Sequence, residues 1–398
     1  MAEPLSGLRV LDLTRVLSGP YATMVLGDLG AEIIKVEIPG KGDDSRDYGP
    51  FLAGESAYFM SINRNKKSIV LNLKTAGGRE ILLRLAEASD VLVENFRPGT
   101  MDKLGLGYGL LSERNPRLVY AACSGFGSTG PFAQKPAYDI IVQGMGGIMS
   151  VTGHPDGPPT RVGVSIGDIV AGLFTVIAIQ AAVQERERSG LGQFIDVSML
   201  DCQLAILENA IARYTITGEV PGRLGNRHPT ITPFTSLETE DGAVIFGAGN
   251  NALFRRLCDA IGRPDLANDP RFETNASRTT VWEPALKPVL EAIFRTRTTA
   301  HWLEKLEGLG SPCGPINTID KVLSNPQVAS RGMLVELEHP VAGKHVVAGP
   351  PFKMSRTPPS ACTAAPVLGE HTEAVLRDVL KFDTSDIERY KKEGCFEP

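Results

Sequence analysis

The sequence predicts an α/β protein with a mainly parallel β-sheet in its larger part and a second, smaller α+β domain inserted later in the chain. In the first third of the 398 residues, short apolar runs typical of strands alternate with segments of helical apolar spacing. Beyond about residue 204 the chain becomes rich in Pro and Gly turns. The length also suits two or three domains at about 150 residues each.

Five strands are expected in the first third, and the segments between them are long enough for helices. The expected strands are residues 8–13, 32–37, 68–73, 90–96 and 118–124. Strands that alternate with helices form βαβ units, which predict parallel pairing.

Three helices are expected to pack on this sheet. Pro20 favours the first turn of a helix that runs to about Leu29. Residues 76–88 have Ile81, Leu82 and Leu85 at helical spacing. Residues 169–188 form a long, nearly all-apolar helix, so we expect it to be buried on most sides.

The later part of the chain predicts a hairpin over residues 235–246, several helices to about residue 309, a helix at 319–323, strands at 334–338 and 345–348, and a last helix at 372–380. We therefore divide the chain into a large domain (1–205), a linker (206–224), a small domain (225–312) and a return segment (313–398).

Composition excludes several classes of function. The 41 Lys and Arg against 46 Asp and Glu give a net charge of −5, which argues against a nucleic-acid partner. The longest apolar stretch has about 15 residues and the N-terminus carries no signal-peptide pattern, so we expect no membrane association. The six cysteines show no CxxC spacing, which predicts reduced thiols in the cytoplasm and no metal site.

A dinucleotide cofactor is not expected, although Glu37 ends the second strand as an acid does in such folds. The turn after the first strand, residues 14–20, contains no GxGxxG, so a pyrophosphate cannot approach the helix closely. We therefore expect neither NAD nor flavin. The glycine-rich stretches 144–147 and 247–250 also lack the Gly-Lys-Ser/Thr of a phosphate loop, and tight turns or close packing explain them equally well.

Basic residues stand near several expected strand ends. The run Asn-Arg-Asn-Lys-Lys at 63–67 precedes the third strand, Lys74 follows it, and Phe96-Arg97 and Lys103 follow the fourth. Several cations beside an aromatic ring suit a nucleotide that carries phosphates. A solvated basic rim is the alternative.

Six motifs spread over nearly the whole chain resemble a known family. They are LDLTRV (11–16), GDLGAEIIKVE (27–37), VENFRPG (93–99), Gly167-Asp168, PCGP (312–315) and LGEHT (368–372). Together they resemble the family III CoA-transferases, the group of formyl-CoA:oxalate CoA-transferase. Within that family, residues 63–68, 225–229 and 247–251 are most similar to the succinyl-CoA:glutarate branch, which handles dicarboxylic acids.

The resemblance implies a Rossmann-like large domain built from both chain ends, so that the return segment completes it. It also implies a homodimer of two interlocked rings, with an acyl-CoA and a free carboxylic acid as small-molecule partners and coenzyme A as the substrate that is exchanged.

Asp168 matches the family's nucleophile. An unperturbed aspartate is already ionised at neutral pH, so no base is needed to activate it. It would attack the donor thioester to form a mixed anhydride, and returning CoA thiolate would convert this to an aspartyl-CoA thioester. From the sequence alone, Asp168 is also a natural N-cap for the helix that follows.

The resemblance also assigns residues to CoA. Ile38 and Pro136 stand where the oxalate enzyme has basic residues, and its glycine-rich flap is missing around residues 223–233, so we do not expect oxalate as acceptor. The assigned CoA contacts are Arg15, Val16, Leu17, Leu71, Lys74, Asn95, Phe96, Arg97, Lys103 and Leu104.

Five residues are candidates for the substrate side. Tyr138 stands where the family's racemases have a histidine, and because tyrosine is a poor base at pH 7, it favours transfer over racemisation. Asp139 corresponds to an acidic position near the active site, and His228 to a loop position. Arg46 and Arg64, together with Arg15, are candidates to bind a second carboxylate, since a guanidinium can hold it with two hydrogen bonds.

The sequence therefore predicts an enzyme: a CoA-transferase that moves CoA from a short dicarboxylyl-CoA, succinyl-CoA first, to another small, glutarate-like dicarboxylic acid. An acyl-CoA racemase or isomerase of the same family is the alternative reaction. A non-catalytic acyl-CoA binding protein and an NAD-dependent dehydrogenase are alternatives from other classes, against which the intact Asp168 and the missing GxGxxG speak.

Overall fold

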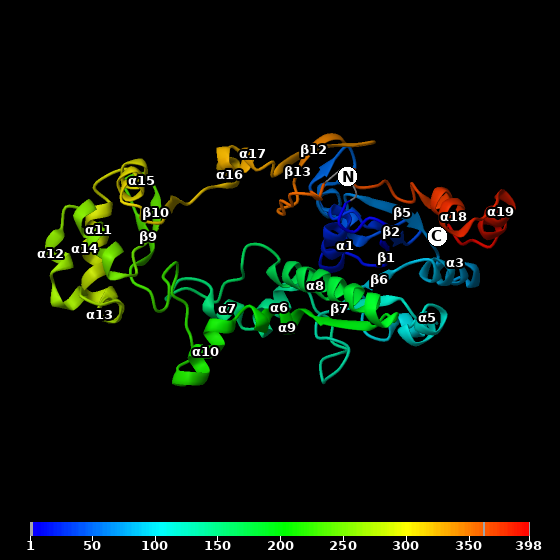
Figure 1. The fold of residues 1–398 in the computed structure, drawn as a ribbon, viewed down its shortest axis with the longest axis horizontal. Helices are drawn as coiled ribbons and strands as arrows, with labels where there is room; N and C mark the ends of the chain where they lie inside the picture. The colour runs from blue at the N-terminus through cyan, green and yellow to red at the C-terminus, as the bar shows by residue number, and fades with distance from the viewer. Residues whose placement is uncertain (1–2, 361–362, 398) are drawn as a thin grey trace. The chain divides into compact units, whose positions relative to one another are not determined.

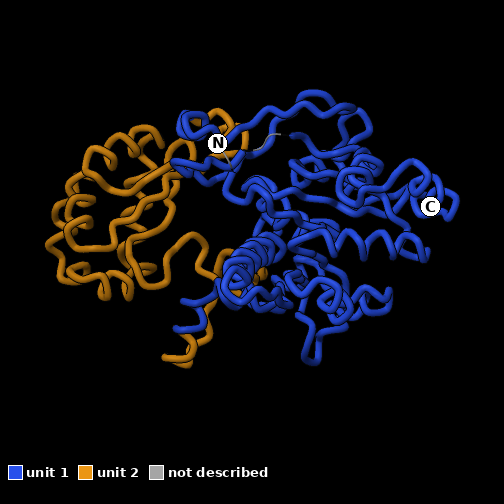
Figure 2. The backbone as a smooth tube through the Cα atoms, turned by 45° about the vertical axis from the view of Figure 1, so that its right-hand side comes forward, with its two compact units in different colours: residues 1–148, 161–212, 326–398 blue, residues 149–160, 213–325 orange. Residues whose placement is uncertain are grey.

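The structure, a computed structural model, describes residues 3–360 and 363–397 and contains two compact units (Figure 2). Unit 1 comprises residues 1–148, 161–212 and 326–398, and unit 2 comprises residues 149–160 and 213–325. Each unit is continuous in space but not in sequence, because the chain leaves unit 1 and later returns to it.

Unit 1 is built on a six-stranded sheet in which every strand pair is parallel. The order is β5-β2-β1-β6-β7-β8, so that successive strands are added first on one side of β1 and then on the other. The expected α/β fold with a parallel sheet is thereby confirmed. The strands are β1 (Arg9–Asp12), β2 (Glu32–Glu37), β5 (Lys66–Val70), β6 (Val91–Glu94), β7 (Val119–Ser124) and β8 (Phe194–Ser198).

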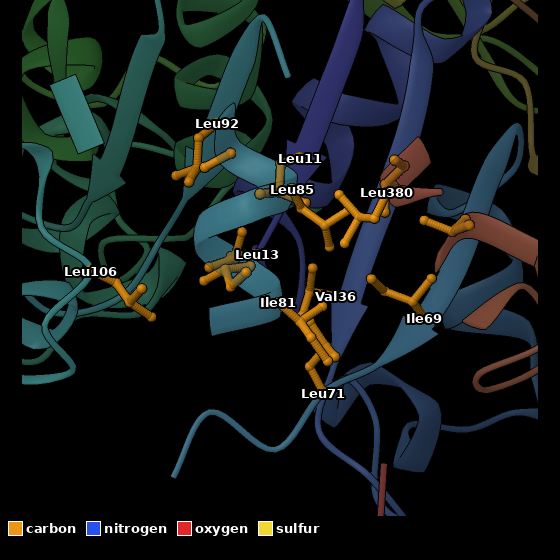
Figure 3. Packing of buried hydrophobic residues seen from close by; sticks show 14 of the residues in the cluster. Leu11, Leu13, Val36, Ile69, Leu71, Ile81, Leu85, Leu92, Leu106 and Leu380 are labelled. Carbon is orange, nitrogen blue, oxygen red and sulfur yellow. The ribbon is translucent and has the colours of Figure 1, made fainter. Parts of the chain in front are cut away.

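Successive residues of each strand face opposite sides of the sheet, and both sides are covered by helices. Val10 faces the core beneath α1 (Ser18–Asp28) and α8 (Ile166–Ser189), whereas its neighbour Leu11 faces the core beneath α3 (Ala76–Glu87). Figure 3 shows part of the second core, where Ile81 and Leu85 of α3 meet strand residues such as Val36 and Ile69.

The C-terminal helices α18 (Thr372–Leu380) and α19 (Thr384–Lys392) complete this same core. Leu376 and Leu380 pack with the strand residues, as Figure 1 shows for the red end of the chain beside α3. The sequence predicted α18 but missed α19, whose Asp383 and Asp386 form a capping box.

Helix α8 lies against α1 on one side and exposes apolar residues on the other. The two helices approach closely, because a Cβ on Gly172 would lie 2.7 Å from the Ser18 carbonyl oxygen. Phe174 and Ile177 are 37% and 61% exposed, so the expectation that α8 is buried on most sides is wrong for the single chain. Helix α8 is long and apolar enough to cross a membrane, but the core helices of other proteins can have the same length and hydropathy.

Unit 2 is α+β. Its three-stranded sheet contains the expected hairpin, and a cluster of aliphatic and aromatic residues that includes Trp282 and Trp302 forms its core. Its strands are β9 (Phe234–Glu238), β10 (Ala243–Gly247) and β11 (Cys313–Pro315), and its longer helices are α11 (Asn251–Ala260), α14 (Lys287–Phe294) and α15 (Thr299–Gly308).

The remaining elements are short. They are η1 (Asp44–Asp47), β3 (Phe51–Leu52), β4 (Glu55–Ser56), α2 (Ala57–Ile62), α4 (Thr100–Lys103), α5 (Tyr108–Arg114), α6 (Asp139–Met145), α7 (Ile148–Val151), α9 (Met199–Ala205), α10 (Glu208–Thr217), α12 (Pro264–Ala267), η2 (Pro270–Phe272), α13 (Asn275–Thr280), η3 (Trp282–Leu286), α16 (Ile319–Leu323), α17 (Pro326–Ser330), β12 (Leu334–His339) and β13 (Gly343–Ala348).

Candidate active site

The loops that follow β1 and β6 meet at the point where the strand order of the sheet reverses. Open α/β sheets bind ligands at such a point, outside the carboxyl ends of the strands. The Asn95 side chain fastens the two loops together: its Oδ1 accepts from the Arg15 backbone N–H at 2.8 Å, and its Nδ2 donates to the Arg15 carbonyl at 2.7 Å.

A cavity of about 290 Å³ opens at this edge. Its apolar walls are leucines and Phe96, and the Arg15 guanidinium carbon lies 5.3 Å from the centre of the Phe96 ring. An aromatic ring, apolar walls and nearby cations suit a planar base linked to phosphates. Of the ten predicted CoA contacts, the cavity brings together Arg15, Leu71, Lys74, Phe96 and Leu104.

The other predicted CoA contacts lie outside the cavity walls. Val16 and Asn95 belong to the loops that border the cavity, and Leu17 is buried against Met24. Arg97 and Lys103 are exposed.

The basic run at 63–67 serves the interior of unit 1. Lys66 is fully buried, with its Nζ 3.1 Å from Asp12 Oδ2, and Arg64 is 4% exposed and paired with Asp28. Lys67 pairs with Glu32, the first residue of β2. This pair therefore lies at the amino end of the strands, whereas the cavity lies at their carboxyl end. Neither reading of this run, as a phosphate site or as a solvated rim, therefore holds for Lys66 and Arg64.

Asp168 lies in the first turn of α8, as its third residue, and Ser165 occupies the N-cap position. The expectation that Asp168 is the N-cap is therefore wrong. Burial raises the pKa of Asp168 to about 7, and the neighbouring charge of Asp139 contributes, while a hydrogen bond from the Ser18 side chain opposes the shift. Asp168 is thus not the ordinary, fully ionised aspartate that the sequence led us to expect.

Asp139 is the first residue of α6 and binds the N-terminus of α8 beside Asp168. Its Oδ1 accepts from the Gly167 backbone N–H at 2.9 Å, and its Oδ2 accepts from Gln143 Nε2 at 2.8 Å. Glycine at 167 permits this contact, because a Cβ there would lie 3.0 Å from the same Oδ1. The Asp139 carboxylate of α6 is therefore held at Gly167, the residue that precedes Asp168 at the N-terminus of α8.

Sequence reasoning missed two partners of Asp139. Gln143 stands four residues later on the same helix, a spacing that predicts side-chain contact. The Arg161 guanidinium lies 3.6 Å from Asp139 Oδ2 and remains 44% exposed. Arg161 comes from a loop 22 residues away, so no local pattern indicated it.

Tyrosines add aromatic surface near the acidic pair. The rings of Tyr48 and Tyr58 meet edge to face at 5.6 Å. Burial raises the pKa of Tyr58 to about 12, and the negative charge of Asp168 contributes to the shift. Tyr138, in contrast, is 72% exposed at the start of α6.

The three arginines expected to bind a second carboxylate have partners within unit 1. Arg64 forms two hydrogen bonds to Asp28, at 2.8 and 2.6 Å, and Arg46 forms two to Glu37, at 2.8 and 2.7 Å. A substrate could bind either guanidinium only if a largely buried ion pair opened. Arg15 is more accessible and lies 3.2 Å from Asp44.

His228 belongs to unit 2, where it stabilises its own loop. Its Nδ1 accepts from the backbone N–H groups of Thr230 and Ile231, at 3.2 and 3.1 Å. The glycine-rich stretch that follows β10 ends in Asn250, which caps α11 by accepting from the Leu253 N–H.

Comparison with known proteins gives one consistent result. The model of CoA-transferase family III matches residues 5–372. An acetyl-CoA:oxalate CoA-transferase of Acetobacter aceti is 47% identical over 94% of this chain and 95% of its own, and a succinyl-CoA:glutarate CoA-transferase of Mus musculus is 43% identical over 99% and 91%. The crystal structure of a CaiB/BaiF family protein from Brucella suis superposes with a TM-score of 0.85 at 40% identity, covering 95% of this chain and all of that one.

Proposed function

Since the chain belongs to CoA-transferase family III, and is therefore an enzyme with acyl-CoA as a substrate, we propose that it transfers CoA from succinyl-CoA or a similar short dicarboxylyl-CoA to another small dicarboxylic acid. The observation that carries this proposal is Asp168, a partly buried carboxyl group whose neighbour is a second carboxylate rather than a cation. Mammalian and bacterial relatives named for succinyl-CoA and glutarate support the choice of acids.

The nucleotide part of CoA binds in the cavity at the β1–β6 edge. Phe96 and the leucines contact the base, while Arg15 and Lys74 provide positive charge for the phosphates. The β1–α1 loop then leads from Arg15 to Ser18, whose side chain is near enough to Asp168 to oppose the rise in its pKa. This connection supports a bound CoA whose thioester end lies towards Asp168.

Asp168 acts as the nucleophile. A carboxylate oxygen attacks the thioester carbonyl, the C–S bond breaks, and CoA leaves as the thiolate, which gives a mixed anhydride. The thiolate then attacks the aspartyl carbonyl and releases the donor acid as its carboxylate, leaving an aspartyl-CoA thioester. The acceptor carboxylate enters and the same two steps run in reverse, so that Asp168 is regenerated.

The environment of Asp168 suits this exchange. Burial removes water from the carboxylate, which makes the anion a better nucleophile and protects the anhydride from hydrolysis. The N-terminus of α8 favours the negative charge, so that a usable fraction remains ionised near pH 7.

Arg161 binds the second carboxylate of the acceptor. Asp139, which contacts the residue before the nucleophile, lies 3.6 Å from its guanidinium, longer than a hydrogen bond, and no other ion pair of Arg161 is found among the residues that the structure describes. Arg161 therefore keeps donors for a substrate, unlike Arg46 and Arg64 with their internal carboxylate partners. Asp139 positions Arg161, and Tyr58 and Tyr138 border the acyl group.

Oxalate is the second candidate acceptor. The sequence differs from the formyl-CoA:oxalate pattern in the flap region, yet a relative named for acetyl-CoA and oxalate is 47% identical. Oxalate has no carbon between its carboxyl groups, so a clamp spaced for glutarate would bind it poorly.

A panel of acids tests the proposal. Succinyl-CoA is mixed with glutarate, oxalate or butyrate, and new thioesters are followed by mass spectrometry. We expect glutaryl-CoA to form fastest. If oxalyl-CoA is the only new thioester, the acceptor is oxalate and not glutarate. If none of the acids yields a new thioester, the proposed transfer from succinyl-CoA to these acids is wrong.

The racemase alternative is tested in deuterated water with a 2-methylacyl-CoA. Rapid exchange of the α-proton without any free acid would favour racemisation over transfer.

We also propose that the protein forms a homodimer and works in a reducing compartment such as the cytoplasm. The exposed Leu173 and Ile177 of α8 line a mostly apolar groove, and Phe174 of the same helix is also exposed, an unusual surface for a monomer. The five described cysteines are free thiols, which supports the compartment. Light scattering after gel filtration tests the dimer, which a mass of one chain would contradict.

A further inference from the structure

The β1–α1 loop contains a strained residue. Val16 has φ of +68°, in the left-handed region that β-branched residues avoid. The other non-glycine residues with positive φ in the described part of the chain are Ala53, Asn65 and Lys381, none of which is β-branched. Such a conformation persists only where surrounding contacts impose it.

The contacts around Val16 come from several strands. Asp12 at the end of β1 accepts from the Thr14 N–H at 2.9 Å, and Lys35 of β2 donates to the Thr14 carbonyl at 2.8 Å. Asn95 after β6 binds both backbone groups of Arg15. Thr14 and Arg15 are thus held by side chains from outside the loop, and the next residue, Val16, is held in the same way.

Asp43 makes the contact to Val16 itself. Its Oδ1 accepts from the Val16 N–H at 3.0 Å and also from the N–H and hydroxyl of Ser45, at 2.9 and 2.8 Å. Its Oδ2 lies 2.8 Å from Lys35 Nζ, and both side chains are fully buried. Asp43 is therefore fixed before any ligand binds.

We propose that Asp43 is a positioning residue for CoA: through the Val16 N–H it holds the β1–α1 loop in its strained conformation. Thr14, Arg15 and Asp43 itself line the cavity, and Ser18, which begins α1 directly after the loop, has its side chain close enough to Asp168 to oppose the rise in the pKa of that carboxyl group. If Val16 relaxed to an ordinary φ, the chain on one side of it would have to move, either Arg15 at the cavity or Ser18 near Asp168. This inference rests on the proposed binding of CoA in that cavity.

A matched pair of variants tests the acceptor oxygen of Asp43, and a change at Val16 then separates its bond to Val16 from its bonds to Ser45. Asp43→Ala alone would leave Lys35 buried without its partner and could prevent folding. Both variants therefore carry Lys35→Met; one adds Asp43→Asn, which keeps an oxygen acceptor, and the other adds Asp43→Leu, which has none. Asp47→Asn, an exposed neighbour, is the control.

We expect the Kd for CoA by calorimetry, and the KM for succinyl-CoA, to be about tenfold higher in the Leu variant than in the Asn variant, with kcat changed less than about threefold. Adding Val16→Gly should restore most of the loss in the Leu variant and change the Asn variant little, because glycine adopts positive φ without strain.

Two results would overturn the inference. One is an equal Kd in the Asn and Leu variants, and the other is a loss that Val16→Gly does not repair, since a general structural defect would be independent of residue 16. If wild-type protein binds no CoA at all, the proposed function fails as well, which is a different outcome from equal Kd values in proteins that bind.

Discussion

Two pairs of carboxyl groups near the β1–α1 loop differ in the charge of their neighbours. Asp12 and Asp43 lie beside lysines, whereas Asp168 lies beside a second carboxyl group, Asp139. Burial alone would raise the pKa of Asp12, but Lys66 and Lys35 hold it below its usual value, and Lys35 does the same for Asp43. Asp168 is buried beside Asp139 instead, and its pKa rises to about 7. Carboxylates that hold the loop are thus paired with buried cations, whereas no cation among residues 3–360 and 363–397 pairs with the proposed nucleophile.

The difference teaches how one fold separates structure from chemistry. A buried ion pair fixes both partners and leaves the carboxylate a weak nucleophile, because its charge is already stabilised. An unpaired carboxyl group costs stability but remains reactive. We can test the contrast by changing either group.

The largest effect is expected for Asp168→Asn. It removes the nucleophile and should lower transfer by about 1,000-fold or more, while the Kd for CoA stays within about threefold. Steady-state kinetics and calorimetry measure both. Transfer within tenfold of wild type would show that another group carries the acyl chain, and Asp139 would be the first to examine by hydroxylamine trapping.

The same variant should be more stable than wild type at alkaline pH. The folded-state pKa of Asp168 lies above its unfolded value, so the stability this group contributes is present at low pH and is lost as pH rises through about 7. The thermal midpoint of Asp168→Asn should therefore exceed that of wild type by a few degrees at pH 8 and by less at pH 5. A constant difference across this range would contradict the raised pKa.

Removing the carboxylate of a buried ion pair should lower the stability of the protein instead of raising it. Asp12→Asn leaves Lys66 buried without its carboxylate and should lower the free energy of unfolding by about 3 to 5 kcal/mol. Lys67→Met is the control, because its pair with Glu32 is exposed and contributes about 0 to 1 kcal/mol. Urea unfolding measures both, and equal losses would show that burial is not the cause.

Arg161→Met should raise the KM for glutarate by about ten- to a hundredfold and leave that for butyrate little changed, because only glutarate has a second carboxylate to pair. Arg46→Met is a poor substitute for this test, since it also breaks the pair with Glu37. Equal KM changes for the two acids would exclude a carboxylate clamp at Arg161.

The smallest effect is expected for Asp139→Asn, which removes the negative charge beside Asp168. In wild type, kcat/KM should rise with pH through about 7 as Asp168 ionises. In the variant this rise should occur at a pH lower by less than about one unit, because burial is the larger cause of the raised pKa of Asp168. A pH–rate profile from 5 to 9 measures it. An unchanged profile would mean that Asp139 has no electrostatic effect on the nucleophile.

Local pattern predicted most of the sheet, and it failed where tertiary contacts decide. The run at 32–37 is one of the strands found, because Ile33, Ile34 and Val36 give it a buried apolar centre between its charged residues. Strand β8 was missed, since Phe194–Ser198 contains an aspartate and a serine and lies at the edge of the sheet. Helix α19 was missed because its surface is mostly polar.

The site could be predicted only in part. Motif resemblance led to Asp168, and half of the ten CoA contacts that it assigned line the cavity. It could not show that Lys66 pairs with Asp12, 54 positions earlier, or that Arg161 lies beside Asp139, because such contacts depend on how distant loops meet. The strain at Val16 is also invisible in sequence, since valine gives no hint of a positive φ.

The packing of α18 and α19 on the first strands has a consequence for synthesis on the ribosome. Residues 9–94 supply β1, β2, β5 and β6, but one face of these strands is covered partly by Leu376, Leu380 and Tyr390. The Asn72 N–H even bonds the Cys395 carbonyl, 2.7 Å away. This face of the nascent sheet therefore stays partly uncovered, with apolar side chains exposed, while some 280 further residues are translated. Chaperones that shield nascent chains should bind this protein early and release it only when translation has passed α19.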